Sequence, residues 1–103
     1  MNLFKDLPHD VNEEIFEDLL CYDKLRIERV VSYGQTSPET GWYDQEENEW
    51  VLVLTGAGEL TFENDIVKRL EAGDYINIPA HTKHKVSWTA PDTETIWLAV
   101  FYQ

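Results

Sequence analysis

Most of the chain alternates between hydrophobic and polar side chains in short runs separated by turn residues. The clearest run is 59–63, where Leu60 and Phe62 lie between polar neighbours and the pair Asn64-Asp65 follows. Alternation with a period of two is typical of strands that bury one face, and such a pair is typical of a hairpin turn. The same criteria predict further strands over 25–33, 49–55, 66–70, 75–78, 84–89 and 95–102.

The order of these predicted strands narrows the fold class. No helical pattern lies between them, which argues against a parallel sheet with crossover helices. About seven short strands, separated by regular turn signals, are typical of an antiparallel sandwich or barrel. The sequence therefore predicts an all-β domain.

One helix is expected before the strands. Asp10 with Glu13 three residues later resembles a capping box. The hydrophobic residues that follow fall on one helical stripe: Val11, Ile15, Phe16, Leu19 and Leu20. We therefore expect an N-terminal helical extension over 1–24 and a barrel domain over 25–103.

Two polar side chains fall on the hydrophobic face of predicted strands. Glu49 and His84 each open a strand and alternate in phase with its hydrophobic positions. A buried carboxylate or imidazole needs a hydrogen-bond partner, a metal or a ligand. Because a lone histidine on an apolar face is more often a satisfied core residue, the alternative is a purely structural role, in which Glu49 bonds His84 or Tyr43.

Composition and charge limit the class of protein. The 103 residues suffice for one domain, and the formal net charge of −12 disfavours nucleic acid and anionic membranes as partners. No apolar run is long enough to span a membrane, and 1–6 lacks the features of a signal peptide. Cys21 is the only cysteine, so no internal disulfide forms. These features predict a cytoplasmic protein.

Two blocks of the sequence resemble the signature of the cupins, which are small double-sheet jelly-roll proteins. Glu49 and Gly56, with six residues between them, match the end of the first block. In the second block Pro79 follows Gly73 after five residues, and His84 follows after four more. The resemblance implies a double-stranded β-helix, or jelly-roll barrel, over roughly 25–102. It also implies a homodimer, because cupins are commonly dimeric.

The resemblance bears on metal binding as well. Cupins that bind a metal usually supply two histidines shortly before the glutamate, where this chain has Tyr43 and Gln45, or Trp42 and Asp44 if one residue bulges. The implied ion is a divalent metal (Mn, Fe, Zn or Ni), and an oxygen-rich ligand set favours Mn²⁺ or Fe²⁺ over a closed zinc site. The candidate ligands are Glu49, His84, Gln45 and Asp44.

Further residues are expected to line a pocket rather than to react. They are Tyr43, His81, Trp88 and Trp97. For each of them a structural or surface role is the alternative, since aromatic side chains usually form core and His81 lies in a corner after Pro79.

Three hypotheses about function follow. In the first, the cupin acts on a small polar molecule by oxygenation, isomerisation or decarboxylation, with a metal as Lewis acid or oxygen carrier. The second is a non-enzymatic ligand-binding or sensory module, whose cavity is closed by the 34–48 loop. The third is a dimer whose polar interior is structural. The sequence assigns no catalytic residue and no substrate.

Overall fold

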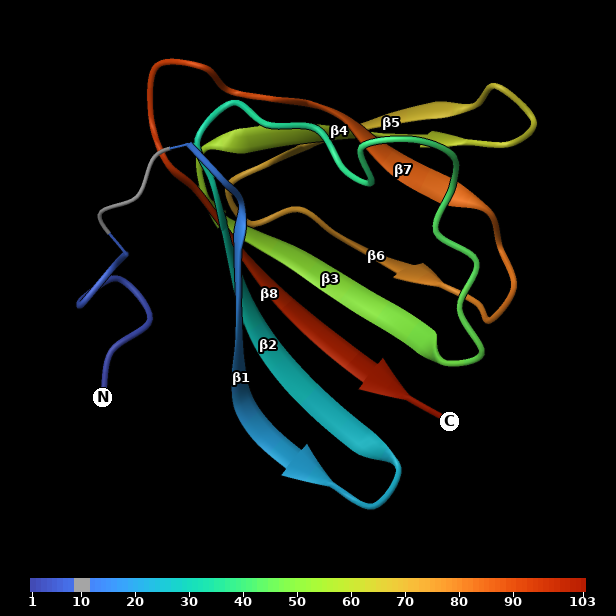
Figure 1. Cartoon of the computed structure of the whole chain (residues 1–103), viewed down its shortest axis with the longest axis horizontal. Coiled ribbons are helices and arrows are strands. Elements are labelled where there is room, and N and C mark those ends of the chain that lie inside the picture. The colour runs from blue at the N-terminus through green and yellow to red at the C-terminus, as the bar shows by residue number, and fades with distance from the viewer. Residues whose placement is uncertain (9–11) are drawn as a thin grey trace.

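Eight antiparallel strands build the domain in two packed layers (Figure 1). The structure is a computed structural model, and it describes residues 1–8 and 12–103. The strands are β1 (Ile15–Tyr22), β2 (Leu25–Ser32), β3 (Asn48–Thr55), β4 (Ala57–Phe62), β5 (Val67–Glu71), β6 (Tyr75–Ile78), β7 (His84–Thr89) and β8 (Thr95–Tyr102).

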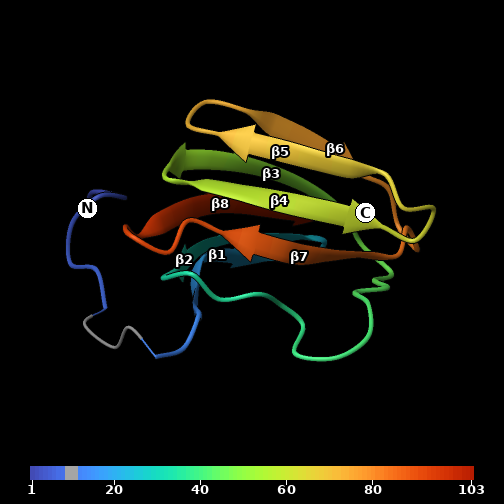
Figure 2. The same cartoon turned by 90° about the horizontal axis from the view of Figure 1, so that it is seen from above.

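The larger sheet has the order β1-β2-β8-β3-β6 and the smaller one the order β5-β4-β7. Figure 2 shows the smaller sheet lying over the larger one, so that the inner faces of both meet in the middle. The prediction of an all-β jelly roll is therefore confirmed. Within residues 1–8 and 12–103, no helix is long and apolar enough to span a bilayer.

The expected N-terminal helix is wrong. Residues 15–22 form β1, which runs antiparallel to β2 from the pair Ile15–Val31 to the pair Tyr22–Leu25. The register shifts between Asp18 and Leu20, so a β-bulge changes the phase of the hydrophobic positions partway along the strand. That change produces spacings of three and four residues, which also fit a helix. Asp10 and Val11, the expected start of the helix, lie outside the described residues.

Hydrophobic side chains from both inner faces form the core. Val53 is fully buried, and Leu60 from the smaller sheet and Trp97 from the larger one are almost so. Gly58 of β4 permits the close approach of the two sheets at Trp97, because a Cβ atom at this position would lie 2.4 Å from the indole ring. The absence of a side chain at position 58 therefore decides where the indole lies.

Strand β1 forms one edge of the larger sheet and carries exposed hydrophobic side chains. These are Phe16, Leu19, Leu20 and Tyr22. An exposed edge strand with apolar side chains is a common place for a second chain to bind. The homodimer implied by the resemblance stays a prediction.

Candidate functional site

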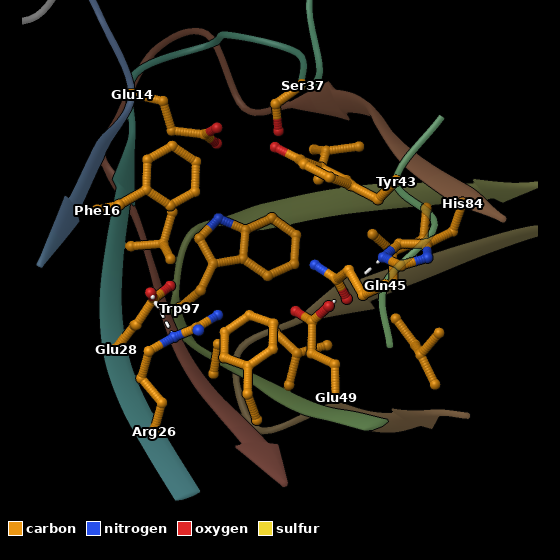
Figure 3. Close-up of a pocket in the computed structure, with 17 residues that line it drawn as sticks. Glu14, Phe16, Arg26, Glu28, Ser37, Tyr43, Gln45, Glu49, His84 and Trp97 are labelled. Carbon is orange, nitrogen blue, oxygen red and sulfur yellow. Dashed lines mark ion pairs between the residues drawn. The ribbon is translucent and has the colours of Figure 1, made fainter. Parts of the chain in front are cut away.

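A cavity of about 370 Å³ lies between the two sheets (Figure 3). Its hydrophobic lining comes from Phe16, Val30, Val51, Leu60, Ile78, Val86, Trp97, Ala99 and Phe101. Its polar lining comes from Glu14, Arg26, Glu28, Ser37, Tyr43, Gln45, Glu49 and His84. A mostly apolar cavity with a few converging polar groups is the usual form of a small-molecule site.

The two inward-facing groups that the sequence indicated do meet in this cavity. His84 opens β7 and is 3% exposed. Its Nδ1 lies 2.7 Å from the carbonyl oxygen of Thr82, and its Nε2 lies 3.4 Å from Oε1 of Glu49, near the start of β3. A carbonyl oxygen only accepts hydrogen bonds, so Nδ1 carries a proton and Nε2 is the nitrogen that faces the carboxylate.

The pKa of His84 is raised above its usual value. Burial is the largest influence and by itself would lower the pKa, because it disfavours the charged imidazolium. The hydrogen bond with Glu49, the hydrogen bond with the Thr82 carbonyl and the charge of Glu49 together outweigh it. The geometry therefore favours an imidazolium–carboxylate pair in the wall of the cavity.

Tyr43 and Gln45 reach the cavity from the long segment between β2 and β3. Tyr43 is fixed beside His84 by two backbone hydrogen bonds, of 2.7 and 3.1 Å, and the two ring centroids are 5.6 Å apart. Burial raises the pKa of the Tyr43 hydroxyl; a hydrogen bond with Ser37 opposes this, and the nearby carboxylates of Glu14 and Glu49 add to it. Tyr43 is thus a neutral hydrogen-bond donor at the cavity wall.

Two expected site residues lie outside the cavity. Asp44, expected as a candidate ligand, points to the surface, where its Oδ1 lies 2.9 Å from Nδ1 of His81. Both side chains are largely exposed, and neither lines the cavity. His81 occupies a left-handed backbone position with φ of 61° in the corner after β6.

Of the two tryptophans expected at the pocket, Trp97 lines the cavity and Trp88 does not. The pairing of β7 with β4 shifts register between Glu59 and Leu60, so Trp88 pairs with Glu59 and Val86 with Leu60. This bulge reverses the alternation after Val86 and turns Trp88 to the outer face. There the guanidinium of Arg69 lies 4.6 Å from the Trp88 ring centroid.

Sequence reasoning missed the polar residues contributed by the N-terminal part of the larger sheet. They are Glu14, Arg26 and Glu28, with Phe16 beside them. The alternation of Arg26, Glu28 and Val30 on one face of β2 was an available signal. Glu14 offered none, because its segment was expected to be helical.

The donor groups do not fit the metal site that the resemblance implies. In the cavity, Tyr43 and Gln45 stand where a metal-binding cupin usually places histidines, and Glu49 and His84 already pair with each other. Within residues 1–8 and 12–103 no group of three histidine, cysteine, aspartate or glutamate side chains is placed to hold a metal ion. One imidazole and one carboxylate fall short of the three or four firm ligands of a stable site.

Comparisons with known proteins agree with this architecture. The family described as "Cupin domain" matches residues 29–101. A solved structure from Ralstonia eutropha JMP134, named a "putative mannose-6-phosphate isomerase", is 41% identical, with a TM-score of 0.93 over 100% of this chain and 96% of that chain. No protein of curated function matches this chain.

More distant structures support the fold alone. An RmlC-like cupin from Desulfovibrio desulfuricans is 21% identical, with a TM-score of 0.78 over 98% of this chain and 93% of that chain. A cupin superfamily protein from Desulfitobacterium hafniense is 18% identical, with a TM-score of 0.77 over 93% and 83%. The two signature blocks, the jelly-roll topology and the match over residues 29–101 show that this chain belongs to the cupin family.

Proposed function

We propose that this cupin catalyses an isomerisation of a small polar carbonyl compound by proton transfer inside the cavity. The observation that carries the proposal is the buried His84–Glu49 pair, with its Nε2–Oε1 distance of 3.4 Å, in the wall of a cavity of about 370 Å³. A paired acid and base beside a ligand cavity is the usual arrangement for general acid–base catalysis.

The roles follow from the protonation of the pair. Glu49 is the base that removes a proton from a hydroxyl-bearing carbon next to the carbonyl group, and His84 donates the Nε2 proton to the carbonyl oxygen, giving an enediol. Glu49 then returns its proton to the former carbonyl carbon, and His84 takes the proton of the hydroxyl on the neighbouring carbon, so that the carbonyl group moves by one carbon. The Thr82 carbonyl holds the His84 ring in the orientation that this needs.

Isomerisation is preferred to oxygenation and decarboxylation because proton transfer is the chemistry that these side chains supply by themselves. The name of the Ralstonia protein, which is an isomerase name, supports the same class. A divalent metal is not given a part in these steps, because the donor groups of this cavity do not fit one.

The test is hydrogen exchange at carbon in D₂O. Mannose, mannosamine and mannose 6-phosphate are incubated with the protein, and loss of the C2 hydrogen signal is followed by NMR. We expect exchange with at least one sugar, and rates about 100-fold lower in Glu49→Gln and in His84→Asn. Glu13→Gln, which removes an exposed carboxylate, is the matched control. No exchange above the buffer rate in the wild type, or exchange as fast in both site variants as in the wild type, contradicts the proposal.

The second candidate is a ligand-binding module without catalysis. The observation that favours it is the cover over the cavity: Ser37 and Val86, and Tyr43 and His84, form β-bridges that hold the 34–48 segment against β7. A sugar that stabilises the protein against thermal unfolding but shows no exchange would favour this candidate over the enzyme.

A further inference from the structure

Glu14 lies at the side of the cavity away from His84, next to Phe16 and Trp97 (Figure 3). Its Oε2 accepts a hydrogen bond from the hydroxyl of Ser32. The Ser32 oxygen in turn accepts one from Nε1 of Trp97 at 3.3 Å. Ser32 is 0% exposed and Trp97 3% exposed, so this chain of hydrogen bonds is internal and holds the carboxylate in one orientation.

The other oxygen of Glu14 is buried and has no hydrogen-bond partner among the described residues. An anionic oxygen that has left water without gaining a donor is unfavourable, so such groups usually face something that the protein itself does not supply. Glu14 also lines the cavity, so a bound molecule that carries a hydrogen-bond donor can lie against this carboxylate.

The charges around Glu14 indicate the charge of the group that carries this donor. Of the described residues that line the cavity, Arg26 is the one arginine or lysine, and its guanidinium is already paired with Glu28 at 3.0 Å and with Glu47 at 3.3 Å. His84 is paired with Glu49. Among the charged side chains that the described residues place at the cavity, Glu14 is therefore the one without a cation, and it repels an anion such as a phosphate group.

The side chains beside Glu14 also suit a cation. Phe16 and Trp97 contribute aromatic rings to the same part of the cavity, and a cation over an aromatic ring is attracted to its negative face. A carboxylate with a free oxygen next to aromatic rings is a common way to bind an alkylammonium group.

We propose that Glu14, Phe16 and Trp97 form a subsite for the ammonium group of a small primary amine, so that the molecule held against Glu49 and His84 is an amino compound. The binding part of this proposal stands by itself, and the identification of the amino compound as the substrate rests on the proposed function.

The test is calorimetric titration of the whole chain with cyclohexylamine and with cyclohexanol, which differ in the charged group and share the ring. We expect the amine to bind at least tenfold more tightly than the alcohol. In Glu14→Gln the affinity for the amine should fall at least tenfold, while the affinity for the alcohol should change less than twofold. Glu13→Gln, which removes the neighbouring exposed carboxylate and the same unit of charge, should bind both as the wild type does.

A second variant tests the proposal if Glu14→Gln does not fold. Ser32→Ala keeps the carboxylate and removes the hydroxyl that orients it, so it should lower the preference for the amine several-fold. Equal binding of both compounds, binding of neither, or a preference that survives Glu14→Gln would overturn the proposal.

The two proposals can fail separately. An amine preference without carbon exchange on any sugar contradicts the isomerase and leaves the subsite standing. Exchange on mannose that is faster than on mannosamine, together with equal binding of the two cyclohexyl compounds, contradicts the subsite and leaves the isomerase standing.

Discussion

The two sides of the cavity treat buried charge differently. On one side the Glu49 carboxylate faces an imidazolium, and the opposite charges compensate each other within the protein. On the other side Glu14 is held by a neutral hydroxyl, and one of its oxygens has no partner among the described residues. The first side is compensated within the protein, whereas the second leaves one carboxylate oxygen unpaired among the described residues. The difference suggests that reaction and recognition are separated across the cavity.

The largest expected effect comes from removing one partner of the Glu49–His84 pair, which forms the compensated side of the cavity. His84→Ala leaves the Glu49 carboxylate, whose side chain is 14% exposed, without its cation. Removing one partner of a buried pair costs about 3 kcal/mol, and we expect the free energy of unfolding in urea at neutral pH to fall by about that amount. A Glu49→Ala/His84→Ala double variant should lose less than the sum of the single losses; a strictly additive loss would show that the pair does not interact.

The next effect sharpens the comparison by changing the donors near His84. Tyr43→His with Gln45→His would place two imidazoles in the cavity wall beside Glu49 and His84. We expect the double variant to bind Mn²⁺ or Ni²⁺ at least tenfold more tightly than the wild type, because four firm ligands would then converge. Titration calorimetry measures this, and equal affinity in both proteins would contradict our account of why the native donors do not fit a metal.

The smallest effect is the pH dependence of the stability that His84 contributes. The pKa of His84 is raised in the folded protein, so its contribution to stability is fully present below about pH 6.5, the usual value for histidine. The contribution is lost as the pH rises through the raised folded pKa. The difference in unfolding free energy between wild type and His84→Asn should therefore shrink with rising pH across that window. If this difference in unfolding free energy grows with rising pH instead, the pKa of His84 is lowered in the folded protein and not raised.

The His84 side could be predicted from the sequence because its signal is local. Glu49 is the second residue of its strand and His84 the first of its own, and the spacing of the signature glycines and proline indicates both positions. Glu49 and His84 then meet because the two sheets close over each other.

The Glu14 side could not be predicted because its signals are not local. The bulge near Leu19 gave the β1 segment a spacing that a helix also satisfies, so the Glu14 carboxylate was not placed in any cavity. A second bulge, in the pairing of β7 with β4, turned Trp88 outward against the expected alternation. Each bulge inserts a single residue, and hydrophobic periodicity does not distinguish that insertion from a change of element.

One missing side chain sets the dimensions of this interior. Any methyl group at position 58 would displace the Trp97 indole, and the indole nitrogen supports Ser32, which in turn supports the Glu14 carboxylate. The width of the cavity and the orientation of the Glu14 carboxylate therefore depend on one position in β4 that is not part of the cavity lining. A substitution at position 58 would therefore change the size of the molecule that the cavity accepts. The same substitution would change the preference of the cavity for a charged ligand.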